Sequence, residues 1–149
     1  MPVDTGMRIA TPVVLLSVLL ACGTSTALPP DLFPATAAGV WRRTSLREMG
    51  ASEAPDPVPR NEIERIAAAS YEGPGKIEAR VYALRSPAVG LELAQRWRPS
   101  ADTVFFNSGP YFVVLKWQAA ERAALQSFIH DLEKKLARRL SRSVSEPRT

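Results

Sequence analysis

The sequence predicts an α+β fold: a small, largely antiparallel sheet with helices packed on one face, in the order β-α-β-α-β-β-α. Residues 76–84 alternate between apolar and polar side chains, which is the pattern of a half-buried strand. Two runs rich in β-branched and aromatic residues, 103–106 and 111–117, flank turn-forming residues at 107–110 and so predict a hairpin. Residues 119–140 carry one apolar stripe at helical spacing. The chain has too few strand-helix-strand crossovers for a doubly wound sheet, which favours the antiparallel arrangement.

The remaining predicted elements follow from shorter patterns. β-Branched and aromatic residues after a glycine predict a strand over 39–46, and three prolines predict a loop over 51–59. Over residues 61–73, apolar side chains recur at i, i+3, i+4 and i+7, which predicts a short amphipathic helix capped by the final glycine. Serine followed by proline at 86–87 begins another helix, which Pro99 must end.

Length and composition limit the classes of protein that the chain can belong to. Its 149 residues and 46% hydrophobic content suit one globular domain. The net charge of +4 is far below that of a dedicated nucleic-acid binder, so we expect no nucleic-acid partner. With one cysteine and one histidine, the chain can form no internal disulfide and no zinc site built from several such ligands. We therefore expect no metal and no cofactor.

An apolar run occupies residues 9–20, directly after Met7 and Arg8. A helix that spans a bilayer needs about 20 apolar residues, so this run is too short and is typical of the apolar core of a signal peptide. Because Met7 and Arg8 alone supply a start and a positive charge, translation from Met1 and from Met7 both remain open.

The four residues after this run are Leu-Leu-Ala-Cys at 19–22, and they resemble the lipobox of bacterial lipoproteins. The resemblance implies cleavage between Ala21 and Cys22 and attachment of diacylglycerol to the Cys22 thiol, usually with acylation of the new amino group. Leu20 departs from the smaller residues that are commoner at its position. Gly23, in place of aspartate, resembles cargo sent to the outer membrane of a bacterium with two membranes. The alternative is an uncleaved helix in which Cys22 is an ordinary apolar residue or a free thiol.

These patterns divide the chain into four parts. Residues 1–21 are the predicted signal peptide, and residues 22–30, which are small, polar and proline-ended, are a lipidated flexible tether. Residues 31–140 form a single α+β domain. The polar residues 141–149 are predicted to be a disordered tail.

A second resemblance covers most of the mature chain. It depends on Leu-Phe-Pro at 32–34, Gly-x-Trp at 39–41, Val-Tyr-Ala-Leu-Arg-Ser-Pro-Ala at 81–88 and Gly-x-Tyr-Phe-Val-Val at 109–114. These motifs resemble an uncharacterised family of bacterial envelope proteins. Since the motifs consist of apolar and turn residues, and the family has no assigned activity, the resemblance supports the fold and implies no chemistry.

The patterns that could indicate catalysis are weak. Gly-Pro-Gly-Lys at 73–76 follows a predicted helix and enters a strand, whereas a phosphate-binding loop follows a strand and begins a helix. His130 is the only imidazole, and its position on the last predicted helix is off the apolar stripe, which favours an exposed histidine over a catalytic base. Catalysis by a pair of carboxylates that are distant in the sequence, such as Asp102 and Glu92, remains an alternative. We therefore predict no catalytic residue.

Aromatic residues of the predicted hairpin lie on both of its faces. Phe105 is followed by Phe106, and Tyr111 by Phe112, so each pair points to opposite sides of a strand. Aromatic residues at such spacing usually belong to a core. With aromatic residues on both faces, we expect one face of the hairpin to be covered, by a helix, by the tether region or by a partner.

Basic side chains gather at the end of the last predicted helix: Lys134, Lys135, Arg138, Arg139 and Arg142. Cations near a helix C-terminus complement the helix dipole and keep the polar face solvated. The functional interpretation is contact with anionic lipid headgroups, another envelope polyanion or an acidic protein. Asp131 and Glu133, one turn earlier, weaken that field, so we expect such contact to be weak and sensitive to salt.

Taken together, the sequence predicts a lipoprotein of the bacterial cell envelope, tethered to a membrane through lipid on Cys22. The outer membrane is favoured over the inner membrane if the cell has both. The domain is predicted to be a non-enzymatic interaction or ligand-binding module with an unidentified partner, such as an envelope protein. The alternative is a small envelope hydrolase with a site that the sequence does not reveal.

Overall fold

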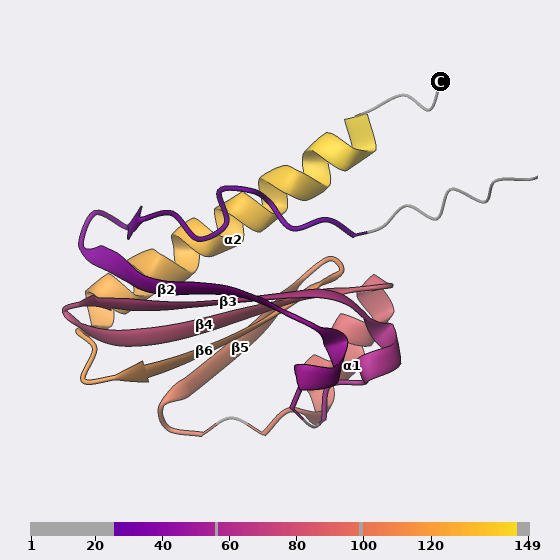
Figure 1. Cartoon of the computed structure of the whole chain (residues 1–149), viewed down its shortest axis with the longest axis horizontal. Helices are drawn as coiled ribbons and strands as arrows, with labels where there is room; N and C mark the ends of the chain where they lie inside the picture. Colours follow the sequence, from indigo (N-terminus) through magenta and orange to yellow (C-terminus); the bar gives the residue numbers. More distant parts are fainter. Residues whose placement is uncertain (1–25, 56, 99, 146–149) are drawn as a thin grey trace, which may run out of the picture.

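An antiparallel sheet forms the centre of the computed structural model, which describes residues 26–55, 57–98 and 100–145 (Figure 1). Within that part of the chain the sheet has six strands in the order β1-β2-β3-β4-β6-β5, and every neighbouring pair is antiparallel. The predicted α+β class with an antiparallel sheet is confirmed. The elements are β1 (Thr36–Ala37), β2 (Trp41–Met49), η1 (Ala51–Glu53), η2 (Arg60–Glu62), β3 (Ile63–Gly73), β4 (Gly75–Leu84), α1 (Pro87–Arg96), β5 (Thr103–Ser108), β6 (Tyr111–Gln118) and α2 (Arg122–Ser145).

The predicted helix over residues 61–73 is wrong, because this segment is the central strand β3. Its alanine-rich sequence favours a helix locally, but β3 pairs with β2 on one edge and β4 on the other, and that pairing overrides the local preference. Near its start β3 is buried on both faces, with Ile66 on one side and Ala67 on the other, and an irregularity between Ile63 and Arg65 shifts its alternation. Together these features give the apolar residues of the strand the spacing expected of a helix. The predicted element order is therefore incorrect at its second element.

The two helices lie on opposite faces of the sheet, which corrects the prediction that the helices share one face (Figure 1). Successive residues of β4 show the reason: Val81 packs in the cluster that contains α2, and Tyr82 packs in the cluster that contains α1. In β6, Val113 likewise packs in the cluster with α2 and Phe112 in the cluster with α1. We call these two sides of the sheet the α2 face and the α1 face. Apolar residues at successive positions of a strand are what burial on both faces requires.

Trp41 and Tyr71 attach α2 to its face of the sheet. Trp41 is 0% exposed, and its Nε1 donates a hydrogen bond to the carbonyl oxygen of Ala124 at 3.0 Å. The rings of Trp41 and Phe128 meet edge to face with centroids 6.3 Å apart, and those of Tyr71 and Phe128 at 5.0 Å. The Tyr71 hydroxyl donates to the carbonyl oxygen of Pro34 at 2.8 Å. Burial raises the pKa of Tyr71 to about 12, although the charge of Arg43 acts in the opposite direction.

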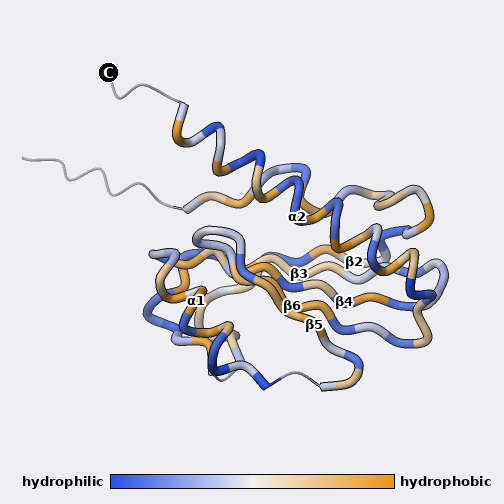
Figure 2. The backbone as a smooth tube through the Cα atoms, turned by 180° about the vertical axis from the view of Figure 1, so that it is seen from behind, coloured by the Kyte–Doolittle hydropathy of each residue, from blue (hydrophilic) through white to orange (hydrophobic). Residues whose placement is uncertain are grey.

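Both faces of the hairpin are covered, although the sequence led us to expect cover over one. Phe105 and Phe112 contact Trp97, which follows α1, with ring centroids 6.2 and 5.3 Å from the Trp97 ring. Phe106 and Tyr111 belong to the cluster under α2. Figure 2 shows hydrophobic residues concentrated in the strands and interspersed with hydrophilic ones along α2, as an amphipathic helix requires. The hairpin, the predicted strand over 76–84 and both helices beginning after residues 86 and 119 are thus found near their expected positions.

Residues 26–30, predicted as part of a flexible tether, pack onto the domain. The Thr26 hydroxyl donates to the carbonyl oxygen of Leu84 at 3.1 Å, and the Tyr111 hydroxyl donates to that of Ala27 at 2.6 Å. Leu28 packs against the hydrophobic cluster that contains α2, and Pro29 is buried. The packed domain therefore includes at least five residues that precede its predicted start at 31.

Helix α2 continues to Ser145, so residues 141–145 are helical although they were predicted as part of a disordered tail. The hydroxyls of Ser141 and Ser145 donate to carbonyl oxygens four residues earlier, at 3.2 and 3.1 Å. These bonds suit a serine within a helix, and neither glycine nor proline interrupts the segment. The last turns of α2 extend past the edge of the sheet (Figure 1).

Candidate functional site

Four of the five predicted basic residues share one flank of α2, beside the N-terminal segment. Lys135, Arg138, Arg139 and Arg142 follow the spacing i, i+3, i+4 and i+7, and they line a hollow of about 90 Å³ together with residues 29–31. Lys134 is exposed and is not among the residues that line this hollow. We call the five cations the basic end of α2.

A hydrogen bond joins the N-terminal segment to the basic end. Lys135 Nζ donates to the carbonyl oxygen of Asp31 at 2.7 Å. Burial raises the pKa of Tyr111, while the charge of Arg139 and its hydrogen bond lower it, which places Arg139 close to the Tyr111 hydroxyl. Within the described ranges, none of the five cations has a carboxylate oxygen within 4.0 Å. Their charge is therefore available to an external anion.

A second candidate surface lies on the part of the α1 face that α1 does not cover. We call it the open sheet face, and it consists of Arg47, Lys76, Glu78, Arg80, Lys116 and Gln118. Its main hollow has a volume of about 520 Å³ and is lined mostly by polar residues, including Lys76, Glu78 and Lys116. A neighbouring hollow of about 220 Å³ extends the surface to Arg47 on β2. Both signs of charge are present along the surface.

The open sheet face was not predicted as a site. Register brings its residues together, because β4 pairs with β6 so that Glu78 lies opposite Lys116 and Lys76 opposite Gln118. These strands are separated by α1 and β5 in the sequence. The polar positions of residues 76–84 were the available signal, since the polar side of a half-buried strand must face solvent or a partner. That signal does not identify which distant strand contributes the other half.

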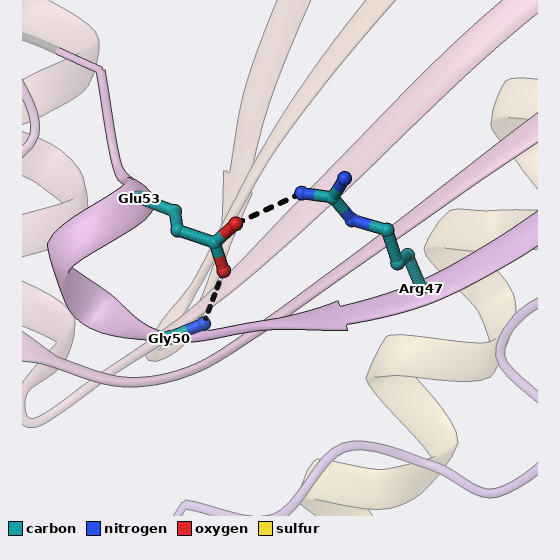
Figure 3. Close-up of polar contacts among 3 residues, drawn as sticks. All are labelled: Arg47, Gly50 and Glu53. Atoms are coloured by element: carbon teal, nitrogen blue, oxygen red, sulfur yellow. Dashed lines mark hydrogen bonds and ion pairs between the residues drawn. The ribbon is translucent and has the colours of Figure 1, made fainter.

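Glu53 of η1 contacts two residues of the preceding segment, Arg47 and Gly50, at the rim of the open sheet face (Figure 3). One carboxylate oxygen of Glu53 accepts from Arg47 Nη2 at 2.9 Å, and the other accepts from the backbone N–H of Gly50 at 3.0 Å. Arg47 and Glu53 are both exposed, so the pair contributes little stability. In the structure the pair directs the Arg47 side chain toward η1, beside the hollow.

Asp102 and Glu92, which the sequence left as a possible pair of catalytic carboxylates, interact with different residues. Glu92 forms an ion pair with Arg96 on α1 at 3.0 Å. Asp102 lines the main hollow of the open sheet face and accepts a hydrogen bond from the Ser100 hydroxyl at 2.9 Å. The Ser100 bond is the largest of the effects that lower the pKa of Asp102. A carboxyl group with a lowered pKa is ionised at neutral pH and is poorly suited to act as a general acid.

Other sequence expectations concern single residues. His130 is exposed, as predicted. The glycines at 73 and 75 belong to the turn between β3 and β4, in agreement with the interpretation of 73–76 as a turn. Among the described residues, no group of three His, Cys, Asp or Glu side chains could hold a metal ion. No helix of the same residues is both long and apolar enough to cross a bilayer. Ala21 and Cys22 lie outside the described residues.

Comparison with protein-family models, curated proteins and solved structures finds no match. The assignment of function therefore depends on the residues and geometry of the chain itself.

Proposed function

We propose that the chain is the precursor of an envelope lipoprotein and that lipid on Cys22 anchors its domain to a membrane. The apolar run at 9–20 followed by Leu-Leu-Ala-Cys at 19–22 supports the anchor. Two or three acyl chains hold a protein on a membrane far more firmly than one, so lipidation at a single cysteine is sufficient for anchoring. The outer membrane is the favoured location in a cell with two membranes, because Gly23 follows the cysteine.

We further propose that the domain holds a polar partner non-enzymatically on its open sheet face. The observation that carries this proposal is the 520 Å³ hollow, whose volume is within the usual range for ligand sites but whose lining includes Lys76, Glu78 and Lys116. A hollow with charges of both signs suits the polar surface of a protein, such as another envelope protein, better than an apolar small molecule. The groups that a hydrolase would combine are not brought together: His130 is on α2, which covers one face of the sheet, whereas Asp102 lines the hollow on the other face.

Replacement of the lipidated residue tests the anchor. Cys22→Ser is expected to abolish lipid attachment, because the hydroxyl cannot accept the thioether-linked diacylglycerol, and the protein should leave the membrane fraction or accumulate as the uncleaved precursor. Intact mass spectrometry and membrane fractionation measure both effects. Thr24→Ser, two residues further on, is the matched control and should leave acylation unchanged. A wild-type protein that retains residues 9–21 and carries an unmodified Cys22 thiol would contradict the proposal.

Photo-cross-linking in the intact cell tests the open sheet face. A photoreactive amino acid at Gln118, beside the main hollow, is expected to form a discrete higher-mass product when irradiated, because a partner held there lies within reach. The same amino acid at Gln126, exposed on α2, is the matched control and should form little of that product. Charge reversal by Lys116→Glu should remove the product at Gln118. A product that persists with Lys116→Glu, or that is equally strong from Gln126, would count against the open sheet face.

A further inference from the structure

We infer that the end of the domain where Thr26 lies rests on an anionic lipid surface, with the basic end of α2 against the headgroups. This inference depends on the proposed anchor at Cys22. It adds to the proposed function an orientation of the domain and the chemistry of the surface that it contacts.

Contacts place Thr26 and the last turns of α2 at the same end of the sheet (Figure 1). Thr26 is held by hydrogen bonds to the carbonyl oxygen of Leu84, at the end of β4, and to the carboxylate of Glu64, at the start of β3. The turn between β5 and β6 is at this end as well, since Leu84 N donates to the carbonyl oxygen of Pro110 at 2.8 Å. A Cβ atom at Gly109 would lie 2.8 Å from Leu140 Cδ1, so α2 contacts the same turn.

Chain length keeps this end near the proposed anchor. Four Cα–Cα steps separate Thr26 from Cys22, and an extended chain covers at most about 3.6 Å per step, or about 14 Å in all. The Debye length at physiological salt is about 8 Å, so charges at the Thr26 end can lie within the field of the membrane surface. Lys76, near the other end of β4, lies about 27 Å from Leu84 along that strand.

The groups at the Thr26 end suit an anionic lipid interface. Arg138, Arg139 and Arg142 are exposed, and within the described ranges none of them pairs with a carboxylate. Val144, on the last turn of α2, is 86% exposed, and an apolar side chain beside cations is typical of helices that lie in a membrane interface. Asp31, Asp131 and Glu133 offset part of the positive charge. The attraction is therefore weak for a free domain, but tethering through Cys22 supplies the effective concentration that lets a weak contact orient the protein.

This orientation has a consequence for the other candidate surface. Because Lys76 and Gln118 pair with each other near the far ends of β4 and β6, the main hollow of the open sheet face projects away from the lipid. A membrane-bound domain would then present that hollow to a partner in the surrounding compartment.

Amine labelling of the whole acylated protein tests the orientation. The chain is produced in a bacterium that processes lipoproteins, purified in detergent and inserted into phosphatidylcholine vesicles with or without phosphatidylglycerol. Mass spectrometry then compares the labelling rates of Lys134, on the basic end, with those of Lys76 and Lys116, on the open sheet face. We expect phosphatidylglycerol to slow the labelling of Lys134 several-fold at low salt, with recovery at high salt. Labelling of Lys76 and Lys116 should not change.

Charge-neutral variants separate the basic end from a general effect of net charge. The double variant Arg138→Gln/Arg142→Gln should lose most of the slowing at Lys134. Arg42→Gln/Arg122→Gln removes two charges at exposed sites near the other end of the sheet; it is the matched control and should retain the slowing. Equal labelling of Lys134 in both kinds of vesicle, or selective slowing at Lys76 and Lys116, would overturn the inference. The intact mass of the same sample reports acylation independently, so an unmodified Cys22 would overturn the proposed anchor instead.

Discussion

Replacement of Trp41 by alanine is expected to lower the free energy of unfolding by about 3–5 kcal/mol, the usual range for removal of a large buried aromatic side chain. The side chain is 0% exposed, and the change would leave a cavity between β2 and α2. It would also remove the edge-to-face contact with Phe128 and the hydrogen bond to Ala124. Denaturant unfolding followed by far-ultraviolet circular dichroism measures the loss.

His130→Ala is the matched control for Trp41→Ala, because it shortens a side chain of the same α2–sheet unit on the exposed side. Its expected effect on the free energy of unfolding is less than about 0.5 kcal/mol. Similar losses for the two variants would show that α2 does not pack over Trp41 in solution.

Gly75→Ala is expected to cost about 3 kcal/mol or more, the second large effect on stability. Gly75 has φ of +129°, a backbone conformation that side chains with a Cβ rarely adopt. A Cβ atom there would also lie 2.6 Å from the carbonyl oxygen of Ala119 and 2.6 Å from the Cα of Ala120. The clash is with backbone, so the connection between β6 and α2 would have to move. Thermal and denaturant unfolding of the variant measure the cost.

Gly50→Ala provides the comparison for Gly75→Ala. Gly50 has φ of −78°, and the one atom near a Cβ at this position is Ser52 Oγ at 3.8 Å. Alanine at such a position loses no contact and restricts the unfolded chain, so the variant should be unchanged or more stable by up to about 1 kcal/mol. If Gly75→Ala is tolerated as well as Gly50→Ala, the turn between β3 and β4 does not pack on the α2 connection as described.

The elements that the sequence predicts correctly are those whose signals are local. The apolar–polar alternation over residues 76–84 and the turn residues at 107–110 involve positions that are close in the sequence. The apolar stripes of α1 and α2 do so as well. β3 could not be recognised in this way. Its alanines favour a helix in isolation, and the strand conformation depends on hydrogen bonds to β2 and β4, which a local pattern does not show.

The candidate sites show the same difference between local and long-range signals. The five cations of the basic end lie within nine positions of the sequence, so their cluster could be predicted. The packing of residues 29–31 beside them could not, because the contact joins segments about one hundred positions apart, as between Asp31 and Lys135. The open sheet face was missed for the same reason, since β4 and β6 meet across the intervening α1 and β5.

The packing of the first described residues against the last helix also affects the order in which the domain can fold. The hairpins β2–β3, β3–β4 and β5–β6 join neighbouring segments and can form early, whereas the contact between Lys135 and Asp31 closes a loop of most of the domain. Thr26 and Ala27 bond to the sheet, but the packing of residues 29–31 is complete only when α2 is in place. In a chain anchored at Cys22, as proposed, the segment nearest the lipid would complete its packing only when the C-terminal helix arrives, so attachment to the membrane and completion of the fold would meet at the same contact.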